Sequence, residues 1–186
     1  MPDAPVKDSI LIDRDDCALI VIDIQDKLLP FIAHKELMVA NVVRLIKFAK
    51  IINMPVIVTE QEKLGETIPE IKTELTDPQP IRKIFYSCFK CEPFVESLRK
   101  LGKKTLILTG METHICIMQT ALHALPEFNV HIISDAVSSR FVNNWELGIE
   151  RMRKAGAVIS STEMVIFELL GRAGTDEFRA TLPLVR

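Results

Sequence analysis

Cys17-Ala-Leu-Ile-Val-Ile-Asp23 is the stretch that decides the fold, because it is a continuous apolar run that ends on a carboxylate. Such a run is typical of a parallel strand buried on both faces, whereas a strand with one face in water alternates apolar and polar residues. Asp23 then lies at the carboxyl end of the strand, which is the edge where open parallel sheets bind their ligands. The stretch therefore predicts both a parallel sheet and a position for the site.

Outward from this stretch the chain alternates between helical and extended patterns. Helices are expected near the C-terminal end and at about 35–53, 93–101, 113–125 and 146–155. Further strands are expected at about 56–59, 82–86, 104–110, 130–134 and 158–160. The segment 61–80 is rich in proline and is expected to run as a long excursion over the carboxyl edge of the sheet. This alternation predicts an α/β fold with helices on both faces of the sheet.

Length and composition favour one compact domain over residues 1–186, since 48% of the residues are hydrophobic and 26% are charged. The net charge of −2, with both signs mixed along the chain, predicts neither nucleic acid nor membrane as a partner. The first nine residues lack a signal-peptide pattern, and no apolar run reaches the roughly 18 residues of a membrane span. A cytoplasmic location is expected, with the four cysteines kept as thiols.

Cys116 is the best candidate for a nucleophile among these cysteines. It lies in the first turn of the helix expected after Thr109-Gly110-Met111, at the same edge of the sheet as Asp23. Unpaired backbone N–H groups and the helix dipole favour a thiolate there, and they also bind the oxyanion formed by attack on a carbonyl. Position alone is equally compatible with an inert cysteine buried among apolar neighbours.

The other candidate residues carry weaker signals when each is taken alone. Asp23 is compatible with a loop or capping carboxylate, and Lys83, beside an arginine, with a solvated surface residue. Cys88 and Cys91 have C-x-x-C spacing, but no second pair of ligands accompanies them. The histidines are dispersed, and only His114 lies near the expected site. Neither glycine-rich phosphate-binding motif is present, so no nucleotide cofactor is expected.

Three motifs together resemble the isochorismatase-like cysteine hydrolase superfamily. They are Val21-Ile-Asp23-Ile-Gln25, Arg82-Lys83-Ile-Phe-Tyr-Ser-Cys-Phe89 and Gly110-Met-Glu-Thr-His-Ile-Cys116, in the order of that family. Ser134-Asp-Ala-Val-Ser-Ser-Arg140 and Arg151-Met-Arg-Lys-Ala-Gly156 look like the branch of isochorismatase domain-containing proteins. The resemblance implies a three-layer α/β/α Rossmann-like fold with a mostly parallel six-stranded sheet, forming a single hydrolase domain.

The resemblance also implies the composition of the site. Asp23, Lys83 and Cys116 match a catalytic triad, and a non-proline cis peptide is expected between Met111 and Glu112. The backbone N–H groups of Glu112 and Cys116 would form the oxyanion hole, with no required role for the Glu112 side chain. Candidate pocket residues are Gln25, Gln61, Phe89 and His114.

Two departures from the family pattern narrow the expected chemistry. Nicotinamidase-like relatives carry an Asp-x-His and a further His after the second strand, whereas this chain reads Thr59-Glu-Gln-Glu-Lys-Leu-Gly65, so no catalytic metal is expected. Isochorismatases that cleave a vinyl ether lack the cysteine found here as Cys116. The resemblance therefore implies hydrolysis of a small amide or related C–N bond through a thioester, without a cofactor.

Alternatives to this enzyme remain open at the level of sequence. One is a binding or scaffold protein that keeps the fold without efficient catalysis, and another is a redox role for Cys88 and Cys91. Besides a small-molecule substrate, the expected partner is a second copy of the chain in a homo-oligomer. The apolar stretches Met164-Val-Ile-Phe167 and Leu169-Leu170 are compatible with an interface or with the core. Segments 61–80 and 139–145 are expected to shape the pocket.

Overall fold

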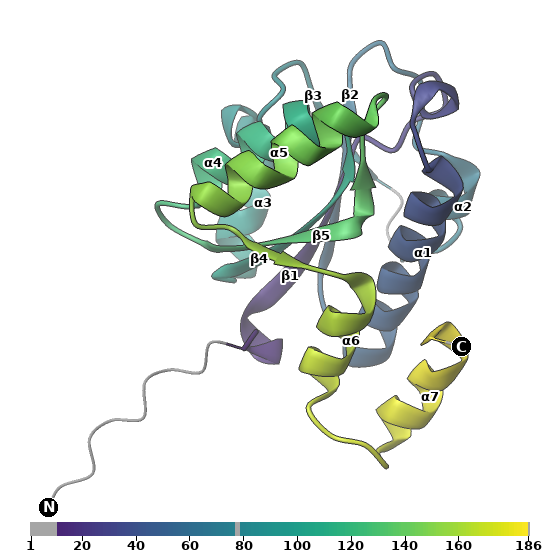
Figure 1. The fold of residues 1–186 in the computed structure, drawn as a ribbon. Coiled ribbons are helices and arrows are strands. Elements are labelled where there is room, and N and C mark those ends of the chain that lie inside the picture. Colours follow the sequence, from purple (N-terminus) through teal and green to yellow (C-terminus); the bar gives the residue numbers. More distant parts are fainter. Residues whose placement is uncertain (1–10, 77–78, 186) are drawn as a thin grey trace, which may run out of the picture.

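A parallel sheet forms the middle layer of the computed structural model, which describes residues 11–76 and 79–185 (Figure 1). Its six strands have the order β3-β2-β1-β4-β5-β6, and each pair of neighbours is parallel. The strands are β1 (Cys17–Ile22), β2 (Val56–Gln61), β3 (Ile81–Lys83), β4 (Thr105–Met111), β5 (Asn129–Ser138) and β6 (Val158–Ser160). The expected parallel six-stranded sheet is confirmed.

Helices cover both faces of this sheet. They are α1 (Lys35–Ile52), α2 (Pro69–Lys72), α3 (Glu92–Leu101), α4 (Met118–Ala124), α5 (Val142–Lys154), α6 (Thr162–Leu170) and α7 (Asp176–Val185). Helices α1, α2, α6 and α7 share one hydrophobic cluster with the sheet, and α3, α4 and α5 share the other (Figure 1). The three-layer α/β/α arrangement is therefore confirmed as well.

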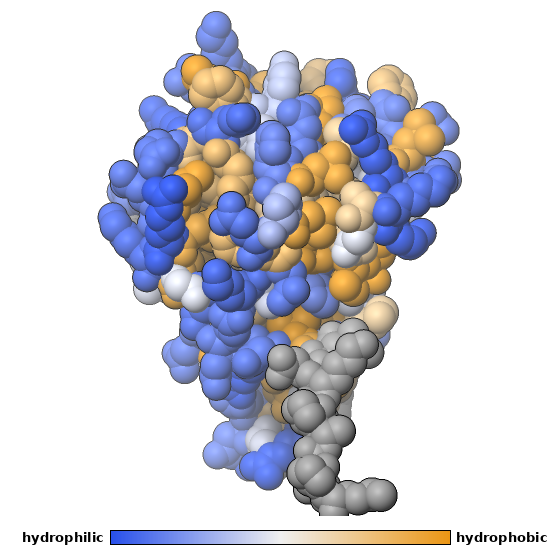
Figure 2. Space-filling model, turned by 90° about the vertical axis from the view of Figure 1, so that its left-hand side faces the viewer, coloured by the Kyte–Doolittle hydropathy of each residue, from blue (hydrophilic) through white to orange (hydrophobic). Residues whose placement is uncertain are grey.

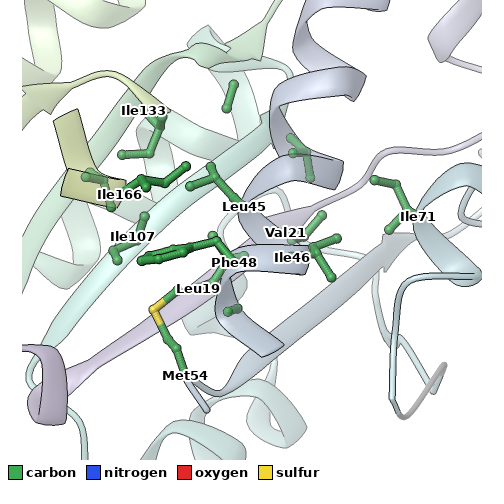
Figure 3. Close-up of a cluster of buried hydrophobic side chains, with 14 of the residues drawn as sticks. Leu19, Val21, Leu45, Ile46, Phe48, Met54, Ile71, Ile107, Ile133 and Ile166 are labelled. Atoms are coloured by element: carbon green, nitrogen blue, oxygen red, sulfur yellow. The ribbon is translucent and has the colours of Figure 1, made fainter. Parts of the chain in front are cut away.

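The centre of the core is β1, whose six residues are all fully buried. Alternate side chains of a strand point to opposite faces, so Leu19 and Val21 join the cluster under α1 while Ile20 and Ile22 join the cluster under α3 to α5. Burial of one such side chain contributes roughly 1.5–3 kcal/mol. Figure 3 shows part of the first cluster, with these members labelled: Leu19, Val21, Leu45, Ile46, Phe48, Met54, Ile71, Ile107, Ile133 and Ile166.

Several element boundaries differ from those expected from the sequence. Strand β5 continues to Ser138, because after a register shift its later residues pair with the extended end of β4. Helix α5 already begins at Val142, so the expected pocket loop 139–145 is only partly a loop. Strand β3 ends at Lys83 instead of running to Tyr86. The excursion 61–80 contains α2 and a bridge to Gln25, and its residues 77 and 78 lie outside the described part.

The surface carries scattered apolar side chains. On the side of the molecule that carries α3, α4 and α5, hydrophobic surface is interspersed with hydrophilic residues (Figure 2). The candidate interface segment in α6 lies partly in the core and partly on the surface. Val165 and Ile166 are buried, whereas Met164 and Phe167 are 59% and 42% exposed. Within 11–76 and 79–185, no helix combines the length and apolar character needed to cross a membrane. The N-terminal segment on which the signal-peptide argument rests lies outside the described residues.

Candidate active site

The carboxyl edge of the sheet brings Asp23, Lys83 and Cys116 together. Asp23 follows β1, Lys83 is the last residue of β3, and Cys116 lies in the turn after β4. The Nζ atom of Lys83 is 2.6 Å from Oδ2 of Asp23 and 3.7 Å from Sγ of Cys116. Residues that are 60 and 33 positions from Lys83 in the chain therefore meet around one ammonium group.

The ion pair of Asp23 and Lys83 is almost completely removed from solvent, with side-chain exposures of 1% and 0%. The second carboxylate oxygen of Asp23 accepts a hydrogen bond of 2.7 Å from the hydroxyl of Thr59. Burial of two charges is costly unless their geometry is good and their remaining polar atoms are satisfied. The contacts of both carboxylate oxygens meet that requirement.

The Lys83 ammonium also contacts three neutral oxygens. It donates to Oε1 of Gln61 at 2.8 Å and to the backbone carbonyls of Phe85 and Tyr86 at 3.3 and 3.4 Å. These two carbonyls belong to the bend that follows Lys83, where β3 ends. Burial acts to lower the pKa of Lys83, but the charge of Asp23 opposes it, and the net result is a raised pKa. Lys83 is therefore a cation at neutral pH.

Cys116 is 7% exposed, and burial raises the pKa of its thiol above the ordinary value for a cysteine. The charge of Asp23 raises this pKa further, whereas the charge of Lys83 lowers it. The sequence predicted a lowered pKa from the helix dipole, which was wrong because burial and the buried Asp23 carboxylate outweigh the dipole. The resting group is thus a thiol, and its use as a nucleophile requires a base beside it.

Gly110 allows the chain to reach this position. Its φ is +111°, and a Cβ atom there would lie 2.0 Å from the carbonyl oxygen of Ile22. The next peptide, between Met111 and Glu112, is cis, as the family resemblance implied. A π-helical turn, Thr113–Ile117, then replaces the expected first α-helical turn and presents Cys116.

A salt bridge fixes the start of this turn. The Glu112 carboxylate is buried and accepts hydrogen bonds from the backbone N–H of Arg140 at 2.9 Å and from its Nε at 3.1 Å. The adjacent His114 ring lies 3.0 Å from the hydroxyl of Ser139 through Nδ1. The Glu112 side chain therefore ties the turn to the end of β5, a role that sequence analysis missed because the two residues are 28 positions apart.

Of the four candidate pocket residues, Gln61 is the one that hydrogen-bonds to the triad within the described residues. Gln25 is fully buried, and its amide donates to the carbonyls of Gln61 and Gly65 and accepts from the Gln61 N–H. Gln25 thus holds the loop after β2. The centroid of the Phe89 ring lies 5.6 Å from the ring centroids of Phe94 and Phe128, in the hydrophobic cluster under α3 to α5.

The remaining cysteines are free thiols in the structure, as is Cys116. Burial raises the pKa of Cys88 to about 12, and the Cys91 sulfur donates to the Arg82 carbonyl at 3.5 Å. Within the described ranges, no group of three or more His, Cys, Asp or Glu side chains is placed to hold a metal ion. At the end of β2, where the family resemblance placed a possible metal site in other members, Gln61 hydrogen-bonds to Lys83.

A cavity of about 360 Å³ is lined by residues other than Asp23, Lys83 and Cys116. It is bounded by the start of α1, the end of β5 and the start of α5, with Leu37, Met38, Val142 and Trp145 among its apolar walls. The Trp145 indole donates to the Ser134 carbonyl at this cavity. The volume is in the range of small-ligand sites, whereas the chemistry-bearing groups lie at the other strands of the same edge.

Residues 17–164 of the chain match the family model described as Isochorismatase domain. Among curated proteins, the chain is 37% identical over 151 residues to the secreted isochorismatase effector Isc1 of Phytophthora sojae, covering 76% of this chain and 71% of that protein. It is 31% identical over 173 residues to isochorismatase domain-containing protein 2A of Mus musculus, covering 90% and 82%. The expected family and branch are confirmed.

Three solved structures share the fold over nearly the whole chain. The MAR1 ribonuclease of Caenorhabditis elegans is 34% identical, with a TM-score of 0.87 and coverage of 94% of this chain and 92% of that one. The YcaC product of Escherichia coli, described as an octameric hydrolase of unknown specificity, is 27% identical with a TM-score of 0.87 and coverage of 95% and 93%. YcaC from Pseudomonas aeruginosa, solved with covalent acrylamide, is 27% identical with a TM-score of 0.86 and coverage of 94% and 91%.

Proposed function

We propose that this chain, which belongs to the isochorismatase family, is a hydrolase that cleaves a small amide or related C–N bond with Cys116 as its nucleophile. The observation that carries the proposal is the Cys116 sulfur 3.7 Å from an ammonium that is itself ion-paired at 2.6 Å with Asp23. A cation in contact with both a carboxylate base and a thiol brings together the parts that covalent acyl transfer needs.

In the first half of the reaction, Asp23 takes the thiol proton, and Lys83 stabilises the resulting thiolate. The sulfur attacks the carbonyl carbon, a C–S bond forms, and the carbonyl oxygen gains the negative charge. When this intermediate collapses, the C–N bond breaks and the amine or ammonia leaves with the proton held by Asp23. The raised pKa of the Cys116 thiol makes this base necessary.

In the second half, water hydrolyses the thioester. Asp23, again a carboxylate, takes a proton from the water as its oxygen attacks the acyl carbon. The C–S bond then breaks to release a carboxylic acid, and Asp23 returns its proton to the leaving sulfur, which becomes the thiol again. We assign the oxyanion of both intermediates to the backbone N–H groups of Glu112 and Cys116, in the turn that the Glu112 carboxylate ties to Arg140. These steps use side chains and water and include no cofactor.

The test is the release of ammonia or amine from a panel of small amides and carbamoyl compounds by wild type and Cys116→Ala. We expect Cys116→Ala to lose at least 1,000-fold in kcat/KM, with an unchanged Tm within about 3 °C. Cys17→Ala, at the opposite end of β1, is the matched control and should keep wild-type turnover. Unchanged hydrolysis by Cys116→Ala would refute the mechanism.

Ribonuclease activity is a second candidate, favoured by the 34% identity to the protein named MAR1 ribonuclease. The formal net charge of −2 argues against it, because RNA binding draws on basic surface. Incubation of wild type and Asp23→Ala with a mixed-sequence RNA separates the two functions. RNA cleavage that persists in Cys116→Ala and disappears in Asp23→Ala would favour the nuclease, whereas the amidase predicts none.

We also propose that the chain forms a homo-oligomer in a reducing, cytoplasmic compartment. The exposed apolar side chains Met164 and Phe167 of α6, and the description of the Escherichia coli YcaC relative as octameric, support the assembly. Four buried thiols support the compartment, while one relative is named a secreted effector. Light scattering measures the mass of the particle directly, and a monomer of 21.0 kDa at micromolar concentration would contradict the assembly.

A further inference from the structure

The end of β2 presents three polar side chains with different partners. Thr59 donates to Asp23, Glu60 accepts from the N–H and hydroxyl of Thr67, and Gln61 accepts from Lys83. Alternate residues of a strand point to opposite faces, so Thr59 and Gln61 reach the triad while the Glu60 carboxylate points away from it. Glu60 and Gln61 are thus consecutive acceptors of similar size, one charged and one neutral, and the neutral Gln61 is the one that contacts Lys83.

The orientation of the Gln61 amide is fixed at both ends. Its Oε1 accepts from Lys83 at 2.8 Å, and its Nε2 donates to the Ile84 carbonyl at 2.9 Å. A flipped amide would place an N–H group against the ammonium and an oxygen against a carbonyl, so the contacts determine the assignment. Its backbone is held as well, by the two hydrogen bonds to the Gln25 side chain.

The neutrality of these acceptors matters for the charge balance of the site. Among the residues that the structure describes, Asp23 supplies the one carboxylate in contact with Lys83, while Gln61, Phe85 and Tyr86 contribute dipoles. Because the oxygen contacts of the Lys83 ammonium other than Asp23 are neutral, its positive charge stays available to stabilise a Cys116 thiolate at 3.7 Å. A second carboxylate in contact with the same ammonium would compete with that thiolate.

We infer that Gln61 is a positioning residue, which holds the Lys83 ammonium against Cys116 through a neutral acceptor and so sets how readily the thiolate forms. The inference rests on the proposed nucleophilic role of Cys116. The titratable groups that face the ammonium are Asp23 after β1, Cys116 after β4 and Cys88 before α3. The charged groups beside Gln61 in the chain are Glu60, which lies 3.6 Å from Arg82, and the exposed Glu62.

The test measures the rate at which acrylamide alkylates Cys116 between pH 6 and 9.5, with the labelled residue identified by peptide mass. Gln61→Glu should move the pH profile upward by roughly one pH unit, which is about a tenfold slower reaction at a fixed pH below the plateau. Glu60→Gln is the matched control, because it exchanges the same two groups on the opposite side of the strand. We expect it to leave the profile in place, even if it lowers the Tm.

Gln61→Met serves as a second variant, since it keeps the length of the side chain and removes the acceptor without adding charge. Its rate at each pH should fall at least about threefold because the ammonium loses one anchor. Wild-type rates at every pH in both Gln61 variants would overturn the inference, while labelling of wild-type Cys116 would leave the proposed function standing. Failure of wild-type Cys116 to react would instead remove the proposed function and the inference with it.

Discussion

Replacement of Lys83 by methionine is the sharpest test of how the site is built. The side chain is fully buried, so Lys83→Met keeps most of the volume but removes the ammonium from the Asp23 carboxylate. Asp23 then retains the hydrogen bond from Thr59 and loses its counter-charge. A buried ion pair that is broken on one side typically costs about 3–5 kcal/mol, because the remaining charge stays uncompensated in the interior.

This free energy translates into a measurable shift of the melting temperature. With 186 residues, an entropy of about 2.1 cal/mol/K per residue gives an unfolding entropy of roughly 0.4 kcal/mol/K near the Tm. A loss of 3–5 kcal/mol therefore lowers the Tm by roughly 8–13 °C. The second substitution Asp23→Asn removes the stranded charge and should restore most of the loss, and asparagine accepts the positive φ of +56° at that position.

The assay is differential scanning calorimetry at pH 7 on the wild type, Lys83→Met and the double variant. Lys154→Met is the control, because that lysine is 75% exposed and pairs with Glu150 on the surface of α5. Its loss should cost at most about 0.5 kcal/mol. If Lys83→Met melts within 2 °C of the wild type, or if Asp23→Asn fails to restore stability, the buried ion pair is not held as described.

Two further predictions concern stability. Gly110→Ala should lower the Tm by more than 10 °C or prevent folding, because the added Cβ would lie 2.0 Å from the Ile22 carbonyl oxygen. In the control variant Gly102→Ala, the added Cβ has no atom within 4 Å and should cost about 1 kcal/mol. Similar Tm values for the two variants in circular dichroism melts would contradict this prediction. Burial lowers the pKa of His131, so the unfolded chain takes up a proton near pH 6.5 that the folded chain excludes, and stability is lost as the pH falls below that value. Between pH 7.5 and 5.5 the Tm of His131→Leu should therefore fall less than the Tm of the wild type. Equal decreases would contradict a contribution of His131 to the pH dependence of stability.

The sequence predicted where Asp23 and Cys116 lie in the fold better than it predicted what surrounds them. Asp23 could be placed at a sheet edge because a continuous apolar strand ends there, and Cys116 because a turn with glycine follows another such strand. Lys83 carried no signal of burial, since its strand has three residues and an exposed arginine beside it. The family pattern identified it, and the ion pair of 2.6 Å with Asp23 explains why a lysine is tolerated in the core.

The pKa of Cys116 is raised, although the position of the residue along the chain predicts a lowered pKa. A position at the start of a helix is readable from the chain, and it favours a thiolate. Desolvation and the charge of Asp23 are properties of the packed molecule, and they outweigh the helix terminus because the thiol is buried in low-dielectric surroundings. A similar limit applies to Gln61, whose partner Lys83 is on another strand and whose neighbour Glu60 would look equally suitable in the sequence.

By itself the sequence determined the layers, the parallel sheet and the edge at which the site lies, because these follow from short-range patterns of apolar and polar residues repeated along the chain. Only the tertiary structure decided which side chains touch. In the folded chain Gln61 hydrogen-bonds to Lys83, Glu112 hydrogen-bonds to Arg140, and Gln25 hydrogen-bonds to the loop after β2. Such contacts depend on the register and twist of strands that are distant in the chain, and an error of one residue in register would exchange the face on which each side chain lies.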